Sequence, residues 1–182
     1  MNFCSHCGNK LKRQIPSGDT NVRDVCLSCN TIHYQNPKVI VGIVPIFENK
    51  ILLCKRSIEP RSGYWTIPSG FMENGETLSE GALREAKEEA HIDATIDYLH
   101  TVYSLPKINQ IYFLYCATIK TPSFRAGNET SEGRLFSLSD IPWESIAFSA
   151  VTFALQGYIE NIKTDQPLLH EGFWNAPPPT NY

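Results

Sequence analysis

The apolar positions of this chain predict a β-sheet in its middle and late parts. Residues 39–56 read VIVGIVPIFENKILLCKR, two apolar runs rich in β-branched residues on either side of Glu48-Asn49-Lys50. Two such runs around a short polar turn are typical of a hairpin between buried strands. Further strands are expected at 94–105 and 109–120, and a shorter one is expected at 132–138.

Two other segments repeat their apolar residues every three or four positions, which indicates helices. One is 75–91, GETLSEGALREAKEEAH, and the other is 149–163. The second helix should bury a face made of Val151, Ala154, Leu155, Tyr158, Ile159 and Ile162. Strands surrounding two helices favour a mixed α/β sandwich.

The helix at 75–91 concentrates five glutamates in a short stretch. At about 100° per residue with Leu78 at zero, Glu85 and Glu89 lie about 20° to either side of it, within or beside the apolar stripe. Glu80 and Lys87 point to the opposite side and form an ordinary solvated pair. Two inward carboxylates would repel each other and resist ionisation unless a cation lay between them. The pattern therefore indicates a divalent metal, and oxygen ligands suit Mg²⁺ or Mn²⁺ better than zinc.

Four of the six cysteines form two pairs, which are Cys4-x2-Cys7 and Cys26-x2-Cys29. This spacing is typical of a zinc ribbon, in which two turns supply a tetrahedral set of thiolates for a structural Zn²⁺. The alternative is two disulfides, which a reducing compartment disfavours. Because the N-terminus shows no signal-peptide pattern and no apolar run reaches about 18 residues, we expect a cytoplasmic protein without a membrane partner.

The chain of 182 residues is long enough for one domain with a full core and a small addition. We expect a zinc ribbon at 1–33, a main domain at 37–163 and a C-terminal tail at 164–182. The tail sequence HEGFWNAPPPTNY is expected to be an extended flap or disordered. The formal net charge of −3 provides no basic field for a phosphate backbone, so nucleic acid is not the expected partner.

From Gly70 onward, the segment GFMENGETLSEGALREAKEEAHI resembles the Nudix box, the signature of the Nudix hydrolase superfamily. The matching positions are Gly70, Glu76, Arg84, Glu85, Ala86, Glu88, Glu89 and Ile92. His91 departs from the pattern because it replaces the usual glycine at the end of the helix, so we expect altered C-capping with activity retained. The resemblance implies an α/β/α Nudix sandwich with a mixed sheet over about 37–163.

The resemblance also implies roles for residues of the box. Glu85, Glu88 and Glu89 would hold Mg²⁺ or Mn²⁺, and they are the candidate catalytic carboxylates. The main-chain carbonyl of Ser69 would be a further ligand, and an ion pair between Glu76 and Arg84 would brace the loop against the helix.

A glutamate before a late strand often serves this family as general base or as an additional metal ligand. Here GNETSEGRLF offers Glu129 and Glu132. We favour Glu132 as the metal ligand and keep Glu129 as the weaker candidate for either role, including that of catalytic base. The alternative is that one of the two is only a loop carboxylate.

The resemblance implies hydrolysis of a nucleoside diphosphate linked to another moiety, a small dinucleotide in the cases closest to this pattern. Ribbon-bearing relatives include NADH pyrophosphatases, but their S-Q-P-W-P-F-P-x-S element is absent from 93–125. The segments IHYQNPKVIVG and IPWESIAF are closer to ribbon-bearing ADP-ribose and FAD pyrophosphatases, so we expect ADP-ribose or FAD as substrate, with AMP and a second phosphomonoester as products. NADH hydrolysis and removal of an NAD-type cap from RNA stay open.

Residues outside the box are candidates for substrate contact. Phe71 and Tyr112 could stack on a ring, Arg56 could touch phosphate oxygens, and Gln110 could make a polar contact, although packing or surface exposure would explain each equally well. A second class of function is a sensor that binds nucleotide or RNA without turnover, using the few basic residues of the ribbon. Because relatives with such a ribbon are commonly dimers, we expect a homodimer.

Overall fold

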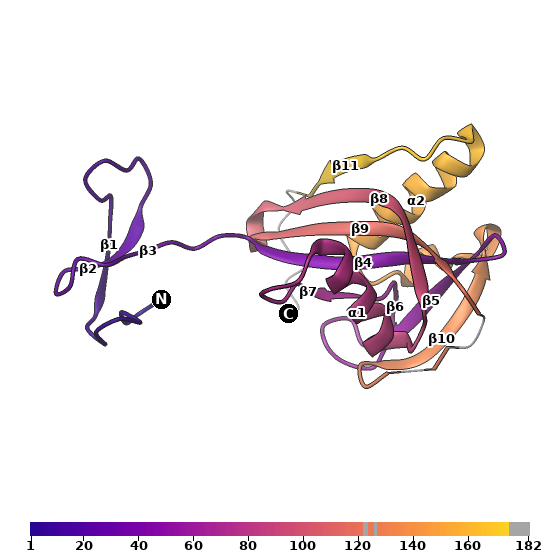
Figure 1. Cartoon of the computed structure of the whole chain (residues 1–182), viewed down its shortest axis with the longest axis horizontal. Helices are drawn as coiled ribbons and strands as arrows, with labels where there is room; N and C mark the ends of the chain where they lie inside the picture. The colour runs from indigo at the N-terminus through magenta and orange to yellow at the C-terminus, as the bar shows by residue number, and fades with distance from the viewer. Residues whose placement is uncertain (122–123, 126, 175–182) are drawn as a thin grey trace. The chain divides into compact units, whose positions relative to one another are not determined.

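The computed structural model describes residues 1–121, 124–125 and 127–174, and it contains two compact units, Met1–Asn36 and Pro37–Tyr182. Figure 1 shows the elements of both units. Neither helix in the described residues is long and apolar enough to span a membrane.

The first unit is a small antiparallel sheet. Its strands are β1 (Leu11–Gln14), β2 (Arg23–Cys26) and β3 (Ile32–His33), with β2 in the centre. Gly8 and Asn30 follow the two cysteine pairs with φ angles of 73° and 57°. Both angles are left-handed, a region that glycine and asparagine tolerate better than other residues, so each pair can sit on a tight turn.

The second unit is built on one mixed sheet of eight strands. Its strands are β4 (Lys38–Phe47), β5 (Lys50–Arg56), β6 (Trp65–Thr66), β7 (Ser69–Phe71), β8 (Ala94–Leu105), β9 (Gln110–Ile119), β10 (Thr130–Ser137) and β11 (His170–Phe173). The main order is β10-β5-β4-β9-β8-β11, while β6 pairs with β5 and β7 pairs with β4. The β4–β9 and β8–β11 pairs are parallel, and the other pairs are antiparallel. The predicted hairpin is confirmed, with Glu48 and Asn49 both at positive φ in the turn.

Two helices cover the sheet, α1 (Leu78–Ala90) and α2 (Ser149–Thr164), and three short 3-10 turns complete the unit: η1 (Pro106–Ile108), η2 (Leu138–Asp140) and η3 (Trp143–Ser145). Alternate residues of β4 join two different apolar clusters: Val41 and Ile43 pack with the alanines of α1, whereas Ile40 and Val44 pack with α2. Because successive side chains of a strand point to opposite faces, the helices lie on opposite faces of the sheet. The expected mixed α/β sandwich is confirmed.

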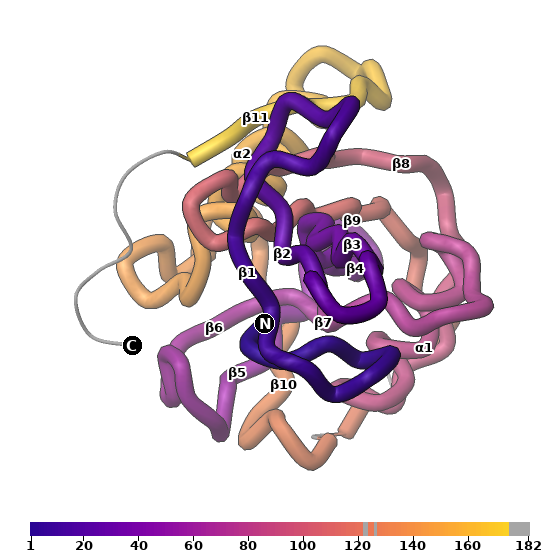
Figure 2. Tube along the Cα trace, turned by 90° about the vertical axis from the view of Figure 1, so that its left-hand side faces the viewer, coloured from indigo at the N-terminus to yellow at the C-terminus, as the bar shows by residue number. Residues whose placement is uncertain are grey.

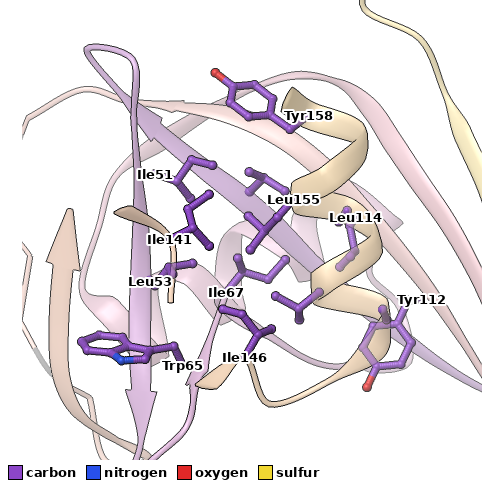
Figure 3. Packing of buried hydrophobic residues seen from close by; sticks show 14 of the residues in the cluster. Ile51, Leu53, Trp65, Ile67, Tyr112, Leu114, Ile141, Ile146, Leu155 and Tyr158 are labelled. Carbon is purple, nitrogen blue, oxygen red and sulfur yellow. The ribbon is translucent and has the colours of Figure 1, made fainter. Parts of the chain in front are cut away.

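The face of α2 differs from the expected one at its C-terminal end. Ile162 is 52% exposed, while Asn161 is buried. The Asn161 amide donates to the Leu168 carbonyl over 3.0 Å, and its oxygen lies 2.8 Å from Nε2 of His170. These bonds compensate for burying a polar side chain, and the next residue of the helix, Ile162, faces solvent. Figure 3 shows the resulting core, with Leu155 of α2 among the sheet residues.

The strand β11 was not predicted from the apolar pattern. It pairs in parallel with β8, from His170 opposite Thr101 to Phe173 opposite Ser104. Figures 1 and 2 both show it alongside β8 at the edge of the sheet. The expected tail therefore contributes a strand to the sheet, and the remainder of its proline-rich sequence, 175–182, lies outside the described residues.

Candidate active site

The second unit contains a cleft of about 1620 Å³. Most of the residues expected to form a site line this cleft, and they are Ser69, Glu85, Glu88, Glu89, Glu129, Arg84, Arg56, Phe71, Gln110 and Tyr112. They come from α1, β5, β7, β9 and the loop before β10. Sequence positions more than 70 apart, from Arg56 to Glu129, therefore meet in one cleft.

Glu85 and Glu89 are buried, as the helical spacing predicted, whereas Glu80 and Lys87 are exposed. Burial raises the pKa of Glu89 to about 8, and the nearby charges of Glu85 and Glu129 raise it as well. A hydrogen bond from the Ser69 amide to Glu89 Oε2, at 3.1 Å, acts in the opposite direction on that pKa. Burial is also the main reason that the pKa of Glu85 is raised. The helix thus holds two carboxylates where their charge is poorly solvated.

The loop before α1 and the helix approach each other so closely that a β-carbon at either of two glycines would displace a glutamate side chain. A β-carbon on Gly70 would lie 2.5 Å from the carboxylate atoms of Glu85. One on Gly81 would lie 2.5 Å from Oε1 of Glu76 and 2.9 Å from the Val41 side chain. Glycine at position 81 lowers the stability of the helix, and its close packing against Glu76 and Val41 explains why it is there.

Arg84 connects the loop to the helix. Its Nε lies 3.0 Å from Oε2 of Glu76 and its Nη2 lies 2.9 Å from Oε1, a bidentate pair. The Arg84 guanidinium is the main reason that the pKa of Glu76 falls to about 2. Nη1 of Arg84 also donates to Glu85 over 2.7 Å and to Glu88 over 3.2 Å, and Nη2 donates to the Phe71 carbonyl.

Both ends of α1 are capped by side chains or backbone of the local sequence. Thr77 and Glu80 form a capping box: the Thr77 amide donates to Glu80 Oε2 over 2.8 Å, and the Glu80 amide donates to Thr77 Oγ1. At the other end, His91 adopts a left-handed φ of 53°, and its N–H donates to the carbonyls of Ala86 and Lys87. His91 therefore takes the conformation that the usual glycine would take.

The structure separates the two late glutamates. Glu129 lines the cleft, and its charge raises the pKa of both Glu85 and Glu89. Glu132 is not among the lining residues; its Oε1 pairs with Nη2 of Arg134 at 2.6 Å. Our preference for Glu132 as metal ligand does not agree with this placement. A register shift in β10 lies between Thr130 and Glu132, and the sequence pattern does not reveal it.

The loop that carries Glu129 is fixed to the end of α1. The Gly127 amide donates to the Glu89 carbonyl over 2.9 Å, and the Ser57 amide donates to the Glu129 carbonyl over 2.9 Å. A β-carbon on Gly127 would collide with the Glu88 carbonyl, so the loop needs glycine to come this close.

The expected substrate contacts surround the rest of the cleft. Arg56 Nε donates to the Pro60 carbonyl over 2.9 Å, and its guanidinium lies over the ring of Phe148 at 5.0 Å. Phe71 is 48% exposed, with Nζ of Lys38 5.0 Å from its ring centre. Tyr112 is buried and joins the core beside α2. These placements leave the exposed Phe71 ring freer to meet a ligand than the Tyr112 ring.

Sequence reasoning missed one aromatic residue of the cleft. Trp174 follows β11, lines the cleft and is 47% exposed. The motif HEGFW was visible in the sequence, but its position beside the cleft depends on pairing between β11 and β8.

The four cysteines of the first unit gather around one point. Their sulfur atoms all lie within 4.8 Å of one another; Cys4 and Cys29 are 3.7 Å apart, and Cys7 and Cys26 are 3.4 Å apart. All four are free thiols, so the disulfide alternative is not realised. Sulfurs arranged tetrahedrally about a zinc ion at about 2.3 Å would be separated by a little under 4 Å, which these distances fit. The Thr31 hydroxyl is the main reason that the pKa of Cys29 falls to about 6, which favours the thiolate that zinc needs.

The carboxylates of the cleft fit a different kind of ion. They offer oxygen atoms only, and the two buried members have little to neutralise them besides Arg84 and the more distant charge of Arg56. Such a donor set suits Mg²⁺ or Mn²⁺. In the described residues Arg84 and the Ser69 amide donate to these glutamates, so an ion would compete with these donors for the carboxylate oxygens.

Comparisons with known proteins agree with the two units. Residues 36–155 match the model of the NUDIX domain, and residues 2–35 match that of the zinc ribbon described as Nudix N-terminal. The structure resembles that of a NUDIX hydrolase from Nitrosomonas europaea at 50% identity, with a TM-score of 0.93 over 97% of this chain and 100% of that one.

Two curated relatives have more specific names. An ADP-ribose pyrophosphatase of Methanocaldococcus jannaschii is 34% identical over 113 residues, which are 60% of this chain and 67% of the relative. An NAD-capped RNA hydrolase, NudC, of Vibrio atlanticus is 31% identical over 148 residues, which are 78% of this chain and 51% of the relative. The chain thus spans about half the length of that hydrolase. Together with the two family matches, these findings show that the chain belongs to the Nudix hydrolase family and carries the family's N-terminal zinc ribbon.

Proposed function

We propose that this Nudix pyrophosphohydrolase cleaves the pyrophosphate bond of ADP-ribose or FAD with the aid of Mg²⁺ or Mn²⁺, giving AMP and a second phosphomonoester. The observation that carries the proposal is the composition of one cleft. Buried carboxylates, Arg56 and half-exposed aromatic rings line it together, which suits a substrate with a charged centre and at least one planar ring. The similarity to an ADP-ribose pyrophosphatase supports the same substrate class.

Glu85, Glu88 and Glu89 would hold the cations, with the Ser69 carbonyl as a further ligand. When bound, the cations would neutralise charge on the pyrophosphate oxygens and lower the pKa of the attacking water. Arg84 would keep the loop and the helix in place through its bidentate pair with Glu76. Because burial raises the pKa of Glu89 to about 8, a cation that binds this carboxylate would displace a proton, so its binding should strengthen as pH rises.

Glu129 is our candidate for the general base. It lies in the cleft close enough to Glu85 and Glu89 to affect both. Its carboxylate would take a proton from the attacking water as the oxygen of that water bonds to one phosphorus and the bridging P–O bond breaks. Arg56, the last residue of β5, would contact phosphate oxygens of the substrate in the cleft, and Gln110 would make a polar contact with it.

A substrate panel tests the proposal. ADP-ribose, FAD and NADH are compared at equal concentration with Mg²⁺, and the products are separated by chromatography. We expect the highest kcat/KM for ADP-ribose or FAD and release of AMP. Preference for NADH, or binding without turnover, would contradict the proposal.

A second candidate activity is removal of an NAD cap from RNA. It is favoured by the similarity to an NAD-capped RNA hydrolase over 148 residues, which are 78% of this chain. An NAD-capped oligonucleotide belongs in the same panel. A kcat/KM for this substrate above that for ADP-ribose would make it the better assignment.

We propose further that the ribbon holds one structural Zn²⁺ and that the protein is a homodimer. The convergence of four cysteine sulfurs supports the zinc. Six large apolar residues exposed on the ribbon unit are available for an interface: Met1, Phe3, Ile15, Val22, Leu27 and Tyr34. Sedimentation analysis that shows a single monomeric species would exclude the dimer.

A further inference from the structure

Trp174 lies outside the segment that matches the NUDIX model, which ends at residue 155, and yet it lines the cleft. Its indole is 47% exposed. Within residues 1–121, 124–125 and 127–174, this indole has neither a ring partner nor a hydrogen-bond partner, whereas its backbone N–H donates to the Ser104 carbonyl over 2.9 Å. The backbone of Trp174 is thus held by the sheet, while its indole ring is accessible to a ligand.

Strand register places Trp174 on the same face of the sheet as the aromatic residues of the cleft. Residues directly opposite each other in paired strands point to the same face. One such row crosses five strands through Phe71, Ile40, Tyr112, Tyr103 and Gly172. Trp174 comes two positions after Gly172 and continues the ladder on β8, so side-chain alternation returns it to this face. Phe71 therefore lies at one end of this row, and Trp174 lies on the same face two residues beyond its other end.

The strand β11, which ends directly before Trp174, packs closely on α2. A β-carbon on Gly172 would lie 2.7 Å from the Phe153 ring, and one on Gly157 would lie 2.8 Å from the His170 ring. Each glycine thus receives an aromatic ring from the opposing element. His170 Nε2 also lies 2.8 Å from Asn161 Oδ1. Contacts this close fix β11 relative to the cleft and with it the position of Trp174.

We propose that Trp174 stacks on the adenine of the substrate and determines affinity for adenine nucleotides at this site. The inference rests on the proposed function, because ADP-ribose and FAD share adenine as their only common aromatic ring. A fixed, half-exposed indole offers a flat apolar surface at little cost in side-chain entropy. The carboxylates of α1 line the same cleft, and the cations that they would hold would bind the reacting pyrophosphate, so the two ends of the substrate would have separate binding surfaces.

This arrangement predicts how Trp174 affects kinetics. Stacking on adenine is equally strong before and during attack on phosphorus. Its loss therefore weakens binding of the substrate and binding of the transition state by the same amount. Such a loss raises KM and leaves kcat unchanged when the substrate equilibrates with the enzyme. Stacking of a base on an aromatic side chain contributes enough that the rise should be about tenfold.

Steady-state kinetics with ADP-ribose and Mg²⁺ test the inference. We expect Trp174→Ala to raise KM about tenfold with kcat within about twofold of wild type, and Trp174→Phe to retain most of the affinity. Trp143→Phe is the matched control, because Trp143 is also exposed, at 37%, and does not line the cleft. Unchanged KM in Trp174→Ala would overturn the inference while leaving the proposed function intact. A wild type that turns over neither ADP-ribose nor FAD would instead refute the proposed function.

Fluorescence separates the adenine end of the substrate from the other end. The chain has three tryptophans, and Trp65 is buried. We expect AMP to quench the emission of the metal-free wild type and of Trp143→Phe, but not of Trp174→Phe, whereas ribose 5-phosphate should quench none of them. Quenching by ribose 5-phosphate alone, or an AMP signal retained in Trp174→Phe, would refute stacking on adenine. Thermal melts of each variant exclude unfolding as the cause.

Discussion

The carboxylate of Glu85 lies directly against the α-carbon of Gly70, where a β-carbon would be only 2.5 Å from it. Gly70→Ala should therefore displace Glu85 from the cleft. We expect a fall in kcat of at least tenfold and a loss of stability of about 1–3 kcal/mol from overpacking. The double variant Gly70→Ala/Glu85→Asp, with its shorter carboxylate, should recover stability without recovering kcat. If the single variant keeps full activity, close approach of Gly70 to Glu85 has no part in catalysis.

The two late glutamates form a matched pair for testing the general base. Glu129→Gln should lower kcat by about a hundredfold or more, the usual contribution of a general base. Glu132→Gln should change kcat less than about twofold, because Glu132 pairs with Arg134 away from the cleft lining. The measurement is kcat for ADP-ribose across pH. A reversed order of effects would restore Glu132 as the functional residue.

Glu89 should make the metal-free protein less stable as pH rises. Its pKa in the folded protein is raised from 4.5 to about 8, so between these values the folded state keeps a proton that the unfolded state has released. Stability from this group is complete below about pH 4.5 and is lost as pH rises to about 8. Glu89→Gln should flatten this dependence and raise the thermal midpoint at pH 8 without metal.

The same substitution should abolish most of the activity and most of the stabilisation by Mg²⁺, because it removes a charged ligand. Thermal melts with and without Mg²⁺ at pH 6 and pH 8, together with kcat, provide the check. If the thermal midpoint of the metal-free protein depends on pH equally in the variant and in the wild type, Glu89 is not the titrating group.

Loss of one ribbon cysteine should release zinc. Cys4→Ser removes a sulfur from the group whose ligand atoms lie within 4.8 Å of one another. Zinc content measured by atomic absorption should fall from one per chain towards zero, with a lower melting temperature of the first unit. Cys116→Ala is the control, because Cys116 lies in the core of the other unit and should leave zinc content unchanged.

A second pH effect comes from the buried His100. Burial lowers its pKa from 6.5, and the neighbouring charge of His170 adds to this effect, while a bond to the Ala154 carbonyl opposes it. The unfolded state then binds a proton more readily, so stability is lost as pH falls below about 6.5. His100→Asn should reduce the fall in thermal midpoint between pH 7.5 and 5.5, although it lowers the midpoint at pH 7.5. An unchanged fall would contradict the assignment to His100.

Local spacing was sufficient to predict α1 and its two buried carboxylates. Each residue of a helix turns by about 100°, so the sequence spacing alone determines the side of the helix to which a side chain points. The four cysteines were predictable for a similar reason, since each pair lies on its own short turn. The placement of Glu129, and not Glu132, among the cleft residues was not predicted, because it depends on a loop docked against α1. Asn161 was missed because an apolar pattern assigns every polar residue to the surface.

The position of Trp174 beside the cleft also has an evolutionary consequence. The part of the chain that holds the carboxylates is common to the family, whereas the strand that positions the indole follows that part. Substitutions or exchanges confined to residues 165–174 would leave the reactive machinery and its helix untouched. Selection could therefore change which nucleotide this enzyme prefers without rebuilding the means by which it breaks the bond.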